Sequence, residues 1–301
     1  MFTYKTYRRT HDIQPSLVGL EDLKRLCSEL YVLNGTARSN EVDYFKKTFE
    51  VKDDDGEETR EKKVKAFERE FQNINSHHVI SVTVEGDSGE IFTIIPAENL
   101  DQVFSVLNLP NRVKSIRLDN WAHYKAVTEK APNFKIEVNL DFREYQIWPF
   151  QNVENSNESS ISISGLDETW VLGAIEKLRS SSERSSSLAG NGLHRKIKYD
   201  FVLWLIGIPG VILFLKMALD GLASLDSWGV GLQVLIYLTA SLFLLQIFRL
   251  FFNYLRWLFP YMELKEQPKK LQGIQRTIAL FCVAGIVSGW LSLIASAIVG
   301  K

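Results

Sequence analysis

The acidic run Asp53-Asp54-Asp55 before Gly56 comes closest to a metal-binding pattern. If Gly56 were the turn glycine of a calcium loop, the first ligand would be Val51 and the twelfth would be Lys62. Neither residue can serve, because a lysine in place of the bidentate glutamate repels the ion. We therefore predict a solvated turn and a helix start here.

Histidine and cysteine spacing does not suggest a metal site either. His77 and His78 are adjacent, and in a strand two neighbouring rings point to opposite faces, so they cannot hold one ion. Cys27 and Cys282 stand in a charged part and an apolar part of the chain, so they predict no disulfide framework. Cys27 falls on the apolar face of a predicted helix, as a small core residue does. We expect neither a metal nor a cofactor.

Catalytic motifs are absent from the sequence. It contains no phosphate-binding loop, dinucleotide fingerprint, zinc-protease helix or Gly-x-Ser-x-Gly elbow. Glu168 and Glu176 could share a helix face, but that face is the solvated one. We expect a protein that is not an enzyme.

Four aromatic residues outnumber what a charged domain surface usually carries: Trp121, Tyr124, Tyr145 and Trp148. They have two interpretations. Either they pack in the core, or they form a surface that contacts a protein partner.

The elements that must position these residues mix two periodicities. Period-2 alternation predicts strands over 80–84, 91–95, 134–142 and 161–163. Helical spacing predicts helices over 20–30, 57–73 and 100–107, and another that Asp167 caps. This pattern predicts an α+β domain over residues 1–179, with a mostly antiparallel sheet of five or six strands and three or four helices on one side.

A linker and basic segment follow over residues 180–198. Its serine- and glycine-rich part, 180–192, has the composition of a flexible tether with a root-mean-square span of roughly 20 Å. The domain is therefore expected to be tethered near the segment that follows.

The last third of the chain has a different composition. Residues 199–301 contain 8 Lys or Arg and 5 Asp or Glu, whereas the first 198 contain 27 and 31. Three apolar stretches, near 201–219, 229–252 and 277–299, are long enough to cross a bilayer, which takes about 20 residues. We therefore predict a three-helix transmembrane domain over 199–301.

Basic residues flank these stretches unevenly. Three lie before the first stretch and five lie between the second and third, while the first loop has only Asp220 and Asp226. Positive charge stays on the cytoplasmic side. The N-terminal domain should thus be cytoplasmic and the short C-terminus on the opposite side. The first 15 residues lack the apolar core of a secretory signal peptide.

The first predicted span contains Gly207, Pro209 and Gly210 at mid-depth, where the proline should kink the helix. Lys216 and Asp220 follow one helical turn apart. Lys216 either extends to the outer headgroups or faces an ion or substrate path.

The second apolar run continues to Phe259, where Pro260 should end the helix. Arg249, Asn253 and Arg256 recur at helical spacing and form one polar stripe. This stripe is either an interfacial anchor or the positive inner mouth of a pore.

The third predicted span contains small residues at helical spacing. Gly285 and Gly289 form a Gly-x-x-x-Gly pair, and Ser288 and Ser292 extend the stripe beside it. Such a stripe favours close helix–helix packing, within the chain or between subunits.

Together these features favour a multipass, non-enzymatic membrane protein. Its cytoplasmic domain would bind a partner or signal and scaffold or relay at the membrane. The alternative is an oligomeric channel or membrane-permeabilising effector gated by that domain. The expected partners are membrane lipid and either a protein or a second copy of the chain. No nucleic acid is expected, since the first 198 residues are mildly acidic.

Overall fold

The computed structural model describes residues 5–14, 16–49, 57–86, 88–95, 113–143, 159–183, 208–209, 229–265, 274–275 and 277–278. They belong to two compact units. The N-terminal unit includes most of residues 1–188 and also takes in 262–267. The second unit includes residues 189–261.

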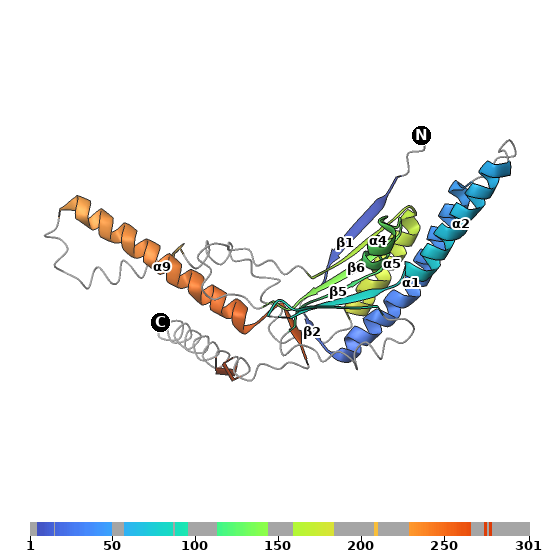
Figure 1. Cartoon of the computed structure of the whole chain (residues 1–301). Coiled ribbons are helices and arrows are strands. Elements are labelled where there is room, and N and C mark those ends of the chain that lie inside the picture. Colours follow the sequence, from blue (N-terminus) through green and yellow to red (C-terminus); the bar gives the residue numbers. More distant parts are fainter. Residues whose placement is uncertain are drawn as a thin grey trace, which may run out of the picture. The chain divides into compact units, whose positions relative to one another are not determined.

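The N-terminal unit is built on one six-stranded antiparallel sheet (Figure 1). Its strands, in spatial order, are β1 (Tyr7–Asp12), β7 (Ser160–Gly165), β6 (Lys135–Asp141), β5 (Val113–Asp119), β3 (Ser81–Gly86) and β4 (Ile91–Ile94). The predicted α+β class is confirmed. The strands expected around residues 80–95, 134–142 and 161–163 are β3, β4, β6 and β7, whereas the sequence patterns used above did not predict β1 and β5.

Alternation along the strands divides the sheet into two unlike faces. One face is apolar and buried, with residues such as Val82, Leu118, Val138 and Ile161 at 0 % exposure. The side chains between them are polar and half-buried. Because the side chains of a strand point alternately to opposite faces, this pattern fixes which face carries the core.

Two helices cover the apolar face. In α1 (Leu20–Thr48), Leu23, Cys27 and Leu30 are buried at helical spacing, as predicted. Helix α5 (Glu168–Ser182) packs on β7, β1 and α1. Its predicted cap is present, because the carboxylate of Asp167 accepts the N–H of Thr169 at 2.9 Å.

Helix α5 continues to Ser182, so the first residues of the predicted 180–198 linker are helical. The helix expected around 57–73 is α2 (Glu57–His77), which forms an aromatic contact with α1 through Phe45 and Phe67, stacked at 5.4 Å. A short helix, α4 (Ala122–Thr128), follows β5. His77 therefore ends a helix and His78 lies in the connection to β3, which corrects the expectation that both occupy a strand.

A second, two-stranded sheet joins distant parts of the chain. Strand β2 (Ser16–Val18) pairs in parallel with β8 (Met262–Leu264). The N–H of Lys265 extends this pairing by donating to the Val18 carbonyl at 2.9 Å. Residues 262–264 thus belong with the N-terminal unit, although the sequence analysis grouped them with the C-terminal part.

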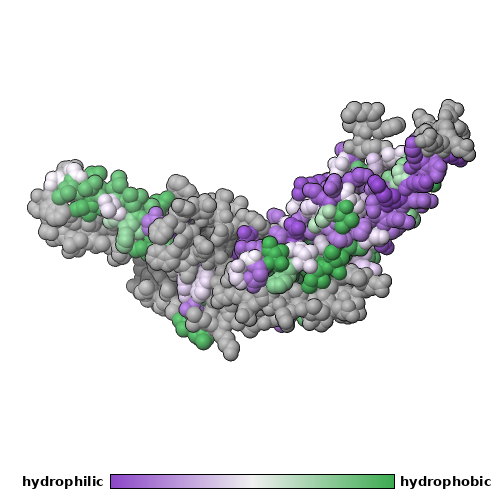
Figure 2. Space-filling view, in the orientation of Figure 1, coloured by the Kyte–Doolittle hydropathy of each residue, from purple (hydrophilic) through white to green (hydrophobic). Residues whose placement is uncertain are grey.

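The second unit contains the long helix α9 (Val230–Leu258), which matches the helix predicted from 229 and ends two residues before Pro260. Large apolar side chains along it are exposed, including Leu235, Leu238 and Phe243 at 57–66 %. Figure 2 shows this hydrophobic surface in green. Among the described residues, no helix is both long enough and apolar enough to span a membrane.

Candidate functional site: the polar face of the sheet

The face of the sheet opposite α1 and α5 is lined by hydroxyl, amide and charged side chains. The strand register places Thr83, Arg117, Asn139 and Ser160 in one row across four strands. We call this surface the polar face. Its polar residues on β3 to β7 are Ser81, Thr83, Glu85, Thr93, Ser115, Arg117, Asp119, Glu137, Asn139, Asp141, Ser160, Ser162 and Ser164, and the exposed Ile91 of β4 lies at its margin. An apolar core could not form on such a surface, so this face is suited to a polar ligand or partner.

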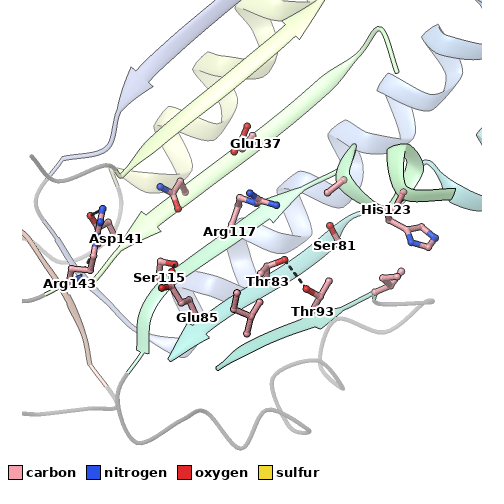
Figure 3. Close-up of a pocket in the computed structure, with 15 residues that line it drawn as sticks. Ser81, Thr83, Glu85, Thr93, Ser115, Arg117, His123, Glu137, Asp141 and Arg143 are labelled. Carbon is pink, nitrogen blue, oxygen red and sulfur yellow. Dashed lines mark hydrogen bonds and ion pairs between the residues drawn. The ribbon is translucent and has the colours of Figure 1, made fainter. Parts of the chain in front are cut away.

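A hollow of about 660 Å³ lies over the polar face (Figure 3). Its lining comes from β3, β4, β5 and β6 and from α4, which borders it with Ala122, His123 and Ala126. The volume is within the range of small-molecule sites. The hollow is open, so it could also receive a loop or strand from a protein.

Arg117 lies in the middle of the hollow (Figure 3). Its side chain is 41 % exposed, and its Nε is 3.2 Å from Oδ2 of the fully buried Asp119. The guanidinium also lies 6.0 Å from the centre of the Trp121 ring. Since a guanidinium has five N–H donors in one plane, a ligand can still be bound by its outer edge.

Asp119 holds this corner of the hollow together. Its Oδ1 accepts Ser81 Oγ at 3.1 Å and the N–H of Ala122 at 2.7 Å, at the start of α4. One buried carboxylate therefore joins β3, β5 and α4. It fixes the Nε end of the Arg117 guanidinium relative to α4, the helix that borders the hollow.

Ion pairs surround the other end of the hollow. Arg143 binds Asp141 through two hydrogen bonds of 2.8 and 2.7 Å. Glu85 accepts Lys114 at 2.6 Å and Ser115 at 3.1 Å. The bond from Lys114 is the main reason why the pKa of Glu85 is lowered. Glu85 is thus charged at neutral pH, and both acids of this end are already engaged with bases.

His123 is the imidazole at the α4 border. Its ring lies 5.4 Å from that of His77, centre to centre. Partial burial, and then the neighbouring His77, lower the pKa of His123. It is therefore suited to hydrogen bonding as a neutral ring.

In the part of the chain that the structure describes, no group of three or more His, Cys, Asp or Glu side chains could hold an ion. The hollow contains both hydrogen-bond donors and hydrogen-bond acceptors. Arg117 donates, Glu137 accepts, and the hydroxyls of Thr83 and Thr93, which are 3.3 Å apart, can do either. Such an arrangement can both donate hydrogen bonds to a polar molecule and accept them from it.

A buried polar network lies behind the hollow and joins it to α1. Asn120 donates to Asn34 of α1 at 3.0 Å and accepts the N–H of Ile136 at 2.8 Å. Asn34 in turn donates to the carbonyl of His78 at 2.9 Å. The turn before β6 is held from α1 as well, because the carboxylate of Glu41 accepts the N–H of Asn133 at 2.8 Å.

The aromatic residues predicted to face a partner or the core do not lie together on one surface. Trp121 is half-exposed beside Arg117. Tyr124 is 3 % exposed, and its hydroxyl donates to Glu70 at 3.1 Å, so it belongs to the α2–α4 contact and not to a surface. Tyr145 and Trp148 lie outside the described residues.

Most of the residues singled out in the apolar part also lie outside the described residues: Gly207, Gly210, Lys216, Asp220, Gly285, Ser288, Gly289 and Ser292. The structure describes Pro209 as exposed, and it places Arg249 and Arg256 in α9. The predicted helix over 100–107 and the acidic run before Gly56 are likewise outside the described residues.

Sequence reasoning missed the polar face as a site, although part of the signal was present. The polar residues that alternate with the apolar ones in β6, such as Glu137 and Asn139, are visible in the sequence, but their spacing does not show that they face a hollow. Arg117 was missed because β5 was not predicted. Cys27 is buried in the core as expected, and this burial raises the pKa of its thiol to about 12.

Comparison with known proteins adds no relative to this picture: no protein-family model, no curated protein and no solved structure gives a significant match.

Proposed function

We propose that this protein is a multipass, non-enzymatic membrane protein. Its N-terminal domain faces the cytoplasm, binds a polar partner on the polar face and scaffolds or relays at the membrane. The short C-terminus lies on the opposite side of the membrane.

The observation that carries the binding role is the hollow over the polar face. Hydroxyl and charged side chains from four strands converge there, with Arg117 in the centre. A protein that used this face only for contact with water would not require the buried carboxylate of Asp119, which fixes Arg117 and α4 together. We infer that the partner presents hydrogen-bonding groups, including an acidic one for the outer edge of Arg117.

The membrane assignment is supported by composition and charge. Three apolar stretches of sufficient length occur in residues 199–301, and the basic residues flank them on one side. The exposed apolar side chains of α9 are consistent with a lipid or protein cover. Membrane lipid, together with a protein partner or a second copy, is the environment we propose.

Site-specific photo-crosslinking in cells expressing the full chain tests the binding role. A photoreactive residue is placed at Thr93 or Ser115 in the hollow, and as a matched control at the exposed Leu172 on α5. We expect adducts from the two hollow positions that Arg117→Ala reduces and Arg179→Ala, at an exposed arginine of α5, does not. Absence of adducts at the hollow, or equal adducts at Leu172, would refute the binding role. Extraction of the chain from membranes by alkaline carbonate would refute the membrane assignment.

A further inference from the structure

The pairing of β8 with β2 points to a second connection between the N-terminal domain and the apolar region. Only residues 259–261 separate the end of α9 from β8. We propose that β8 is a latch. Paired with β2, it ties the chain that follows α9 to the N-terminal domain; unpaired, it leaves the 184–198 segment as the chain connection between the domain and the apolar region. The inference rests on the proposed function for the membrane location of α9, but not for the pairing itself.

The latch is docked through buried side chains as well as through backbone. Met262 and Leu264 are 2 % and 4 % exposed, and Val18 on the facing strand is 5 % exposed. The three strand residues of β8 align with Ser16 to Val18. The contact between β2 and β8 is therefore specific, because it combines a defined strand register with the burial of apolar side chains.

The latch can open without disrupting the main sheet. The β2–β8 pair is a separate two-stranded sheet of three residues per strand, and the six-stranded sheet is complete without it. A small void of about 20 Å³, lined by Met262, Leu26 and Leu140 among others, lies along the seam. A strand pair of only three residues is the kind of contact that opens locally.

Opening the latch would act on the start of α1. Strand β2 leads directly into Gly19, whose N–H donates to Asp22 in the first turn of α1 at 3.0 Å. Further along, α1 carries Asn34 and Glu41, which bind the segments on either side of α4 behind the hollow. The same helix thus contacts both the latch and the frame of the polar face, so the state of one can bias the other.

Disulfide trapping in the full chain tests the pairing. Leu17 and Glu263 are register partners in this parallel pair. Neighbouring strands lie about 4.8 Å apart, which is within the Cα separation that a disulfide bridges. The pair L17C/E263C is made with Cys27 and Cys282 replaced by alanine, and a specific protease site is placed in residues 184–198. The control pair L17C/K265C is two residues out of register. After oxidation and cleavage, we expect L17C/E263C to remain one species and the control to separate into two.

Two variants test whether burial holds the latch. Leu264→Asp in the L17C/E263C chain should slow trapping, whereas Lys265→Ala, at the exposed neighbour, should not. Hydrogen exchange of the unmodified chain should show residues 259–265 exchanging before β5 and β6, because opening is local. Equal trapping of the two cysteine pairs, or exchange of β8 together with the main sheet, would overturn the latch. Trapping that succeeds in a chain that does not sediment with membranes would confirm the pairing but refute the proposed function.

Discussion

Acidification should destabilise the N-terminal domain through His78. This imidazole is 0 % exposed. Its Nε2 lies 3.2 Å from the Phe134 carbonyl, which accepts from a protonated Nε2, and 3.3 Å from the amide nitrogen of Asn120, which donates to an unprotonated one. Among the described residues, no group accepts from or donates to its buried Nδ1. Protonation would therefore place both a charge and an unpaired N–H in the core.

The size of the effect follows from the pKa. Burial lowers the pKa of His78 from 6.5 to about 4, against the hydrogen bond to Phe134, which raises it. Because the folded pKa is below the unfolded one, the neutral ring stabilises the fold above pH 6.5. This contribution is lost as the pH falls from 6.5 towards 4. At about 1.4 kcal/mol per pKa unit, the loss between pH 7 and pH 5 is about 2 kcal/mol.

The assay compares the full chain with His78→Gln, which keeps an N–H donor and does not titrate. Thermal unfolding of the N-terminal domain is followed at several values between pH 7 and pH 4. For a domain of this size, a loss of about 2 kcal/mol lowers the melting temperature by about 4–8 °C. Between pH 7 and pH 5, the melting temperature of the wild type should therefore fall by about 4–8 °C more than that of the variant. Desolvation raises the pKa of Glu41, so Glu41 favours the folded state more as the pH falls, which is opposite to the effect of His78. Both chains contain Glu41, so its effect cancels in the comparison. Parallel pH profiles for the two chains would refute a buried neutral His78.

Three further predictions concern packing and burial. Gly165→Ala should destabilise the domain by about 1–3 kcal/mol, because its Cβ would lie 2.9 Å from the Phe134 ring and 3.1 Å from the Trp170 ring. Gly173→Ala in α5 meets nothing within 4 Å and should stabilise the domain by up to about 1 kcal/mol. Chemical denaturation of both variants checks the contrast. Asp119→Ala should cost about 2–4 kcal/mol and expose α4 to hydrogen exchange, with Asp119→Asn milder because its amide oxygen still accepts. Cys27 should resist maleimide until the domain unfolds, as peptide mass spectrometry would show, since the thiol is fully buried and its pKa is raised to about 12.

Local periodicity predicted most of the elements of the N-terminal domain. The alternation from Phe134 to Phe142 shows one buried and one polar face directly, and the leucine spacing after Leu20 marks the buried side of α1. The strand β5 was harder to find, because the adjacent polar residues Lys114 and Ser115 interrupt its alternation, and because Asp119 is polar although it is buried. A residue that is buried for hydrogen bonding does not look like a core residue in a sequence.

Contacts between distant segments could not be predicted in the same way. Strand β8 has only three residues, and its partner β2 lies more than 240 positions earlier. The sequence of Met262 to Leu264 does not distinguish a strand from the end of a loop, because these residues adopt a strand conformation through their pairing with β2. The hollow is similar: Arg117 and Asn139 become neighbours only through the β5–β6 register.

The buried polar network explains why the hollow should keep its shape. An apolar core between α1 and the β5–α4 segment could be as stable as the present contact, but it would tolerate sliding. Asn120, which is bound to both Asn34 and the backbone of Ile136, permits one arrangement of helix and strand. Because Asn120 lies directly between Asp119 and α4, the same contact fixes the corner of the hollow that holds Arg117. The geometry of the polar face therefore depends on where α1 lies, and α1 begins next to the strand that β8 pairs with.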